Sequence, residues 1–130
     1  MKSFILECCV DSVESAIAAQ KGGADRLELC SNLIIGGTTP GINLFLAVRE
    51  KVCLKVHVLI RPRFGDFCYT DEEFSIMLKD VEMFRKNGAD GVVIGMLNKD
   101  GSLDAARMEK LISAAGDMSI TLHRAFDVCR

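Results

Sequence analysis

Two short segments of the sequence share the pattern Glu-x-Cys. Glu7 and Cys9 belong to the first segment, and Glu28 and Cys30 belong to the second. On a β-strand, residues two positions apart point to the same face, so each glutamate is expected to share a face with its cysteine. Neighbouring strands lie about 5 Å apart, and two thiols at matching heights could therefore meet one metal ion. Thiolates select Cu(I) or zinc over magnesium and calcium, and Cu(I) accepts as few as two sulfurs. Cys9 and Cys30 are therefore a candidate Cu(I) site.

Each of these residues also has an interpretation without a metal or a reaction. Free cysteine is among the most buried residue types and often acts as a small apolar side chain. Glu7 and Glu28 are candidate catalytic residues, but they could equally be buried partners of Arg61, Arg63 or Arg124, because carboxylates are almost never buried unpaired. The sequence alone leaves both alternatives open.

Arginines and a histidine follow two later apolar runs. Arg61 and Arg63 stand on either side of a proline. A guanidinium binds a carboxylate or a phosphate through two parallel hydrogen bonds, so this pair predicts a site for a small anionic substrate. Structural pairing with acidic residues is the alternative. His123 is the best candidate for general acid–base catalysis. His57 lies deeper in its run and is expected to be a hydrogen-bonded core residue.

Alternating apolar runs and amphipathic segments must position these side chains. Strands are expected at residues 4–9, 26–30, 55–60, 91–95 and 119–123, and helices at about 12–21, 40–51, 71–87 and 104–115. Asp11 with Glu14, and Thr70 with Glu73, predict capping boxes at the first and third helices. Thr39 predicts the N-cap of the second helix.

This order of elements predicts an α/β fold, namely the first half of a TIM (β/α)8 barrel in a single partial domain over residues 1–130. A complete barrel usually takes about 250 residues, and its functional groups gather at the carboxyl ends of the strands. A flavodoxin-like open sheet is the alternative, but such a sheet normally covers its last strand with a helix. The sequence ends without a fifth helical segment, which favours a fragment of a longer barrel.

Composition excludes several classes of partner. Sixteen Lys and Arg against eighteen Asp and Glu give a net charge of −2, which does not favour nucleic acid or a membrane surface. No apolar run is long enough for a membrane helix, so a cytoplasmic location is expected, with reduced cysteines. The sequence has no Walker loop and no G-x-G-x-x-G motif, so no nucleotide cofactor is indicated.

Five motifs, in order, resemble the CutC family, whose members are called copper homeostasis proteins. They are Leu6-Glu7-Cys8-Cys9-Val10-Asp11-Ser12, Gly23-Ala24-Asp25-Arg26-Leu27-Glu28-Leu29-Cys30, Gly36-Gly37-Thr38-Thr39-Pro40, Ile60-Arg61-Pro62-Arg63 with Gly65-Asp66-Phe67, and His123-Arg124-Ala125-Phe126-Asp127. The resemblance implies a cytoplasmic TIM barrel of roughly twice this length. It also implies Cu(I) binding, with Cys9 and Cys30 matching the candidate copper cysteines.

The resemblance further implies an enzyme-like barrel mouth. The matching positions are Glu7, Glu28, His123 and Asp127 as catalytic candidates, and Arg61, Arg63 and Arg124 as substrate-binding candidates. Two functions are therefore expected: a copper homeostasis protein that binds Cu(I), or an enzyme that acts on a small anionic metabolite. Because a half-barrel leaves unpaired strand edges, the chain is also expected to form a homo-oligomer.

Overall fold

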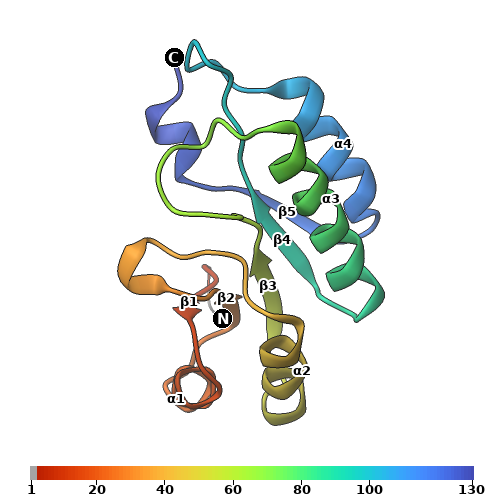
Figure 1. The fold of residues 1–130 in the computed structure, drawn as a ribbon. Coiled ribbons are helices and arrows are strands. Elements are labelled where there is room, and N and C mark those ends of the chain that lie inside the picture. Colours follow the sequence, from red (N-terminus) through yellow and green to blue (C-terminus); the bar gives the residue numbers. More distant parts are fainter. Residues whose placement is uncertain (1–2) are drawn as a thin grey trace.

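The computed structural model describes residues 3–130. Within them, a curved parallel sheet carries helices against one face (Figure 1). The strands are β1 Glu7–Val10, β2 Arg26–Leu29, β3 Lys55–Leu59, β4 Gly91–Ile94 and β5 Ser119–Leu122. The helices are α1 Val13–Lys21, α2 Ile42–Lys51, α3 Asp71–Lys86 and α4 Ala105–Ala115, with short 3-10 helices η1 Leu33–Ile35 and η2 Arg124–Val128. No helix in this part of the chain is long and apolar enough to span a membrane.

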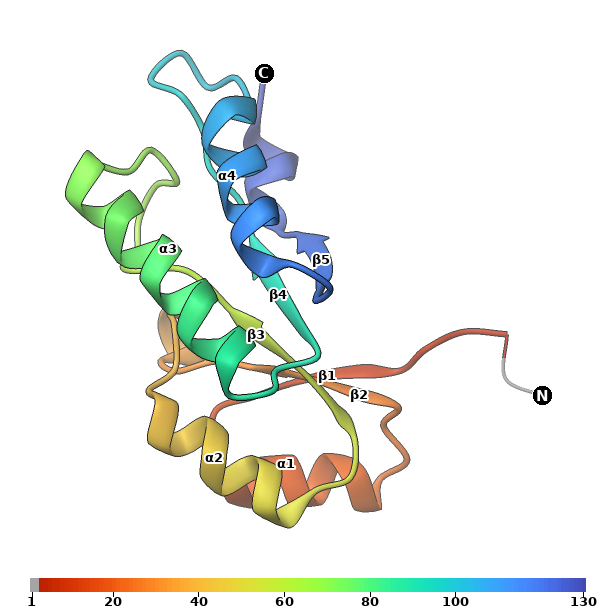
Figure 2. The same ribbon diagram turned by 90° about the vertical axis from the view of Figure 1, so that its right-hand side faces the viewer.

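The strands lie side by side in chain order, from β1 to β5. A flavodoxin-like sheet has the order 2-1-3-4-5 and helices on both faces, so that alternative is wrong. In a (β/α)8 barrel, consecutive strands are neighbours and the helices form an outer ring. Figure 2 shows α1 to α4 on the outer side of the curved sheet, with the inner side uncovered. The fold is therefore the first five strands and four helices of a TIM barrel, as predicted.

The two faces of the sheet have different side chains. The outward side chains of β2, β3 and β4 are fully buried against the helices, and they include Leu27, Leu29, Val56, Val58, Val92 and Ile94. Phe45 of α2 and Phe84 of α3 meet edge to face beneath them, with ring centroids 5.5 Å apart. On the inner face, Cys30, Leu59 and Val93 form a separate small buried cluster. The inward direction expected for Cys30 is thus confirmed.

Two of the three predicted helix starts are corrected. At α1 the N-cap is Ser12, whose hydroxyl accepts from the backbone N–H of Ser15, and the side chain of Ser15 bonds back to the N–H of Ser12. The hydroxyls of Ser12 and Ser15 therefore form this cap. The predicted pair of carboxylates, Asp11 and Glu14, stands one residue earlier in the chain. Helix α2 starts after Gly41 rather than Thr39. The Thr39 hydroxyl is already used, because it accepts the backbone N–H of Arg61 at 2.8 Å. The capping box of Thr70 and Glu73 is confirmed.

The first strand is shorter than predicted. Leu6 bonds to Asp25 rather than joining the ladder: its carbonyl accepts the Asp25 N–H, and its own N–H donates to the Asp25 carboxylate, both at 2.8 Å. Strand pairing therefore starts only at Glu7, opposite Arg26. The apolar residues before it are exposed, with 66% of Phe4 accessible. Glu7 thus begins β1. The sequence had suggested that Glu7 lies near the carboxyl end of this strand, and that prediction is wrong.

Candidate functional site

A cavity of about 370 Å³ opens at the carboxyl ends of the strands, where the barrel mouth would lie. Its walls come from all five strands and from the loops that follow them. The lining residues are Cys9, Glu28, Cys30, Leu33, Gly36, Leu59, Arg61, Phe67, Val93, Thr121, His123 and Arg124. Six predicted site residues therefore come together: Cys9, Glu28, Cys30, Arg61, His123 and Arg124.

One wall of the cavity carries the two thiols and a carboxylate. Cys9 lies opposite Glu28 in the strand register, so Cys30 stands one inward position further along β2 than expected. The sequence could not show this offset, because it depends on how the two strands are staggered. The Glu28 carboxylate compensates by reaching both sulfurs: the Cys9 thiol donates to Oε2 and the Cys30 thiol to Oε1, each at 3.7 Å. Cys9 is exposed and Cys30 is buried.

The three groups influence one another's ionisation. A hydrogen bond from the Cys30 thiol lowers the pKa of Cys9, against opposing effects of burial and of Glu28. The same contact, together with burial, raises the pKa of Cys30. Burial and the charge of Glu7 raise the pKa of Glu28. The Cys9 thiol therefore loses its proton more readily than the Cys30 thiol.

Arg61 lines another part of the cavity and is only 7% exposed. Its two terminal nitrogens donate to the backbone carbonyls of Gly37 at 3.0 Å and Gly65 at 2.9 Å. Its guanidinium carbon stands 5.2 Å from the centre of the Phe67 ring. The Nε atom is buried without a hydrogen-bond partner in the described structure. Glu7 and Glu28 are therefore not the partners of this arginine that the sequence left open.

His123 lies beside the same aromatic ring. Its ring centroid is 5.0 Å from that of Phe67, and its Nδ1 accepts the backbone N–H of Ala125 at 3.1 Å. In the neutral ring the proton must then be on Nε2, which is buried and without a partner in residues 3–130. Burial, with the charges of Arg61 and Arg124, lowers the pKa of His123 to about 4. At neutral pH this side chain is a hydrogen-bond donor at Nε2.

Gly95 makes the position of His123 possible. A side chain there would overlap the histidine ring, since its Cβ would stand 2.6 Å from Nδ1. Gly91, further down the same strand, gives similar room to His57, because a Cβ there would lie 2.8 Å from that ring. His57 is buried as predicted, but its Nδ1 lacks a hydrogen-bond partner among the described residues. Sequence reasoning missed Gly95 and Phe67, although the absence of a polar side chain after β4 was a usable signal for Gly95.

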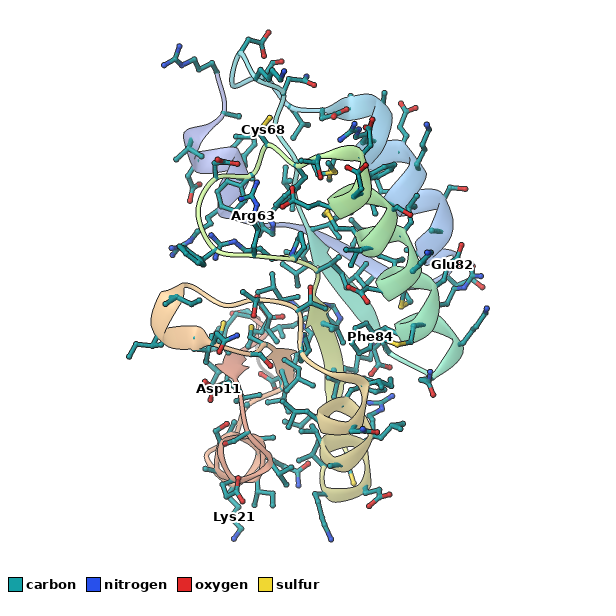
Figure 3. All side chains as sticks on the ribbon, viewed as in Figure 1. Asp11, Lys21, Arg63, Cys68, Glu82 and Phe84 are labelled. Atoms are coloured by element: carbon teal, nitrogen blue, oxygen red, sulfur yellow. The ribbon has the colours of Figure 1, made fainter. Side chains whose placement is uncertain are left out.

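The remaining predicted site residues lie outside the cavity. Arg63 belongs to the loop before α3, where it bonds to Glu73 at 2.6 Å and to Asp66 at 3.2 Å (Figure 3). Glu7 pairs with Arg26 at the start of the strands. Asp127 is exposed and lines a shallow depression next to the cavity, together with His123 and Arg124. Within residues 3–130, no group of three or more His, Cys, Asp or Glu side chains is arranged to hold a metal ion.

Comparison with known proteins identifies the family of this chain. The sequence model of the CutC family matches residues 4–130. The chain belongs to the CutC family. A protein named as a family protein CutC from Citrobacter koseri is 52% identical over 125 residues, which is 96% of this chain and 50% of that protein. Another from Bacteroides fragilis is 51% identical over 131 residues, covering 100% of this chain and 52% of the relative.

A solved structure agrees with the CutC assignment. The crystal structure of a protein from Streptococcus agalactiae, described provisionally as a copper homeostasis protein CutC, superposes with a TM-score of 0.87 and 33% identity. The match covers 98% of this chain and 62% of the other. The chain therefore spans about half the length of the curated CutC relatives that it matches.

Proposed function

We propose that the intact CutC protein is a cytoplasmic copper homeostasis protein, and that it binds Cu(I) through Cys9 and Cys30. One observation carries the proposal: both thiols hydrogen-bond to the two oxygens of a single carboxylate, that of Glu28. The two thiols also lie within hydrogen-bonding range of each other, which supports their sharing one ion, and two sulfurs suffice for Cu(I). The copper-related description of the Streptococcus agalactiae structure supports this choice of metal.

The ionisation of the three groups suits the uptake of a cation. The lowered pKa of Cys9 favours a thiolate at this exposed position, where Cu(I) can arrive. Cys30 keeps its proton more tightly, because its pKa is raised by the contact with Cys9 and by burial. Cu(I) must displace that proton, and the Glu28 carboxylate, which already accepts the thiol hydrogen bond, is placed to receive it. In this scheme Glu28 moves a proton and does not ligate the metal.

Anaerobic Cu(I) titration of the intact protein against a coloured Cu(I) chelator tests the proposal. The parent is expected to take one Cu(I) per chain from the chelator, and the double variant Cys9→Ser/Cys30→Ser to take none. The matched control is Cys53→Ser/Cys68→Ser, which removes two thiols outside the cavity. Equal competition by parent and Cys9→Ser/Cys30→Ser would refute the proposal.

A second candidate function is an enzyme acting on a small anionic metabolite. The observation that favours it is the presence of Arg61, Arg124 and His123 in one cavity. In this scheme the arginines attract the anion, and His123 polarises it through Nε2–H. A thermal-shift screen of anionic metabolites on the intact protein, followed by assay of each stabilising compound with parent and His123→Ala, tests the idea. Turnover that survives in His123→Ala would remove His123 from the mechanism.

A further inference from the structure

The charge of Arg61 lacks a counter-ion. Four less buried arginines, Arg26, Arg49, Arg63 and Arg107, each pair with a carboxylate. Arg61 is only 7% exposed, yet within the described residues it hydrogen-bonds to backbone carbonyls, lies beside the Tyr69 hydroxyl and has no carboxylate at ion-pair distance. Charged side chains are almost never fully buried unless they are paired. The most secluded of these arginines is thus the one that needs an anion from outside the chain.

A second observation, independent of charge, points to the same wall. Among residues 3–130, neither Arg61 Nε nor His123 Nε2, both buried, has a hydrogen-bond partner. Both side chains stand about 5 Å from the Phe67 ring, one through its guanidinium carbon and one through its ring centroid. Buried donors without acceptors are costly, and native structures rarely tolerate them close together. An anion with several oxygens could give each of these donors an acceptor.

We propose that this wall binds one small oxyanion, a carboxylate or a phosphate group, with Arg61 as counter-ion and His123 Nε2–H as a second donor. The inference rests on the second candidate function and names its substrate class. The oxygens of the bound anion accept hydrogen bonds from Arg61 and His123, and its negative charge balances the buried positive charge of Arg61.

The rest of the cavity defines the other end of the ligand. Beyond the polar wall, Leu33, Leu59 and Val93 line one part of the cavity, and the two thiols with the Glu28 carboxylate line another. An apolar body attached to the anion would therefore lie against the three aliphatic side chains. The volume of about 370 Å³ is at the lower end of the range for small-molecule sites. Arg124 is exposed at the rim and adds positive charge along the path of entry.

Calorimetric titration of the intact protein at constant ionic strength tests the proposal. The probes are inorganic phosphate, acetate and pentanoate, with chloride as the reference anion. Saturable binding of phosphate alone identifies a phosphate ligand, and binding of pentanoate more tightly than acetate identifies a carboxylate with an apolar body. His123→Phe keeps a ring against Phe67 but removes the donor, and a charge-assisted hydrogen bond is worth about tenfold in affinity or more. Arg61→Gln is expected to weaken binding at least as much.

Arg85→Gln is the matched control, because it removes one positive charge from an exposed position on α3 and should leave affinity unchanged. If Arg61→Gln fails to fold by circular dichroism, His123→Phe decides alone. Absence of saturable binding of any probe, or equal affinity in parent and His123→Phe, would overturn the proposal. Failure here leaves the Cu(I) proposal standing, since that titration depends on Cys9 and Cys30. Anion binding without any turnover would support this inference but would contradict the second candidate function, an enzyme.

Discussion

At the scale of single residues, the backbone of β4 makes room for the two histidines of the chain. Gly95 lies where the ring of His123 crosses the strand, and alanine at this position would overlap that ring. Gly95→Ala is therefore expected to destabilise the protein by about 1–3 kcal/mol, the usual cost of overpacking, and to displace His123. Urea unfolding measures the loss. Gly41→Ala is the control, because its Cβ would meet no atom within 4 Å. Equal stability of the two variants would contradict the role given to Gly95.

The lowered pKa of His123 makes stability depend on pH. The pKa falls from its ordinary value of 6.5 to about 4, so between these values the unfolded chain binds more protons than the folded one. Stability from this residue is complete above pH 6.5, declines as the pH falls toward 4, and is lost below it. Its size is at most about 3.5 kcal/mol, from roughly 1.4 kcal/mol per unit of pKa.

Urea midpoints of parent and His123→Phe between pH 4 and 7.5 check this expectation. The parent should lose more stability than the variant as the pH falls, while His57, whose pKa is also lowered by burial, contributes equally to both proteins. Parallel curves for the two proteins would show that His123 does not titrate as expected.

Strand alternation predicted much of the candidate site, but not how far along the strands each side chain lies relative to its neighbours. The period of two correctly placed Glu28, Cys30 and His123 on the inner face. It could not place Cys9 relative to Cys30, because the stagger between β1 and β2 depends on backbone pairing. Nor could it separate Arg61 from Arg63, since Asp66 of the loop before α3 and Glu73 of α3 supply carboxylates only to Arg63.

At the scale of elements, the start of α3 holds the loop beside the cavity. The Thr70 hydroxyl accepts the Glu73 N–H, and the Glu73 carboxylate accepts the Thr70 N–H and binds Arg63. Thr70→Ala is expected to cost about 1 kcal/mol, the usual value for losing an N-cap, whereas Thr70→Ser keeps the hydroxyl and should cost less. Thermal unfolding and amide hydrogen exchange in the first turn of α3 measure the difference. Identical behaviour of the two variants would mean that the cap contributes nothing.

The elements themselves were easier to predict than their ends. The periodicity of the sequence identified every strand and the four α-helices, because alternation and amphipathic spacing are local properties. The ends depend on contacts with distant residues: Asp25 delays β1 by bonding to Leu6, and Arg61 occupies the hydroxyl of Thr39 that was expected to cap α2. Such partners are visible only after the chain has folded.

At the scale of the whole molecule, the sheet has two free edges, at β1 and at β5. Apolar side chains beside the β5 edge are exposed, including Leu122 at 38% and Phe126 at 62%. We expect the 130-residue chain on its own to self-associate, because unpaired edges and exposed apolar groups favour pairing with a second copy. Sedimentation velocity should show species larger than the monomer.

The double variant Leu122→Ser/Phe126→Ser should shift the chain toward the monomer. Ile76→Ser removes an exposed apolar side chain from α3, away from both edges, and should leave association unchanged. A parent chain that sediments as a monomer at all concentrations would contradict the expectation of a homo-oligomer.

The chain-order arrangement of the strands also bears on how the protein is made. Each strand pairs with the one synthesised just before it, so the sheet can grow in the direction in which the ribosome releases the chain. Cys9, Glu28 and Cys30 have all been translated once β1 and β2 have emerged, whereas His123 is translated about a hundred residues later. The residues of the wall that carries the two thiols are thus translated before His123, the second proposed donor to the anion. The two walls of the cavity are completed at different stages of translation.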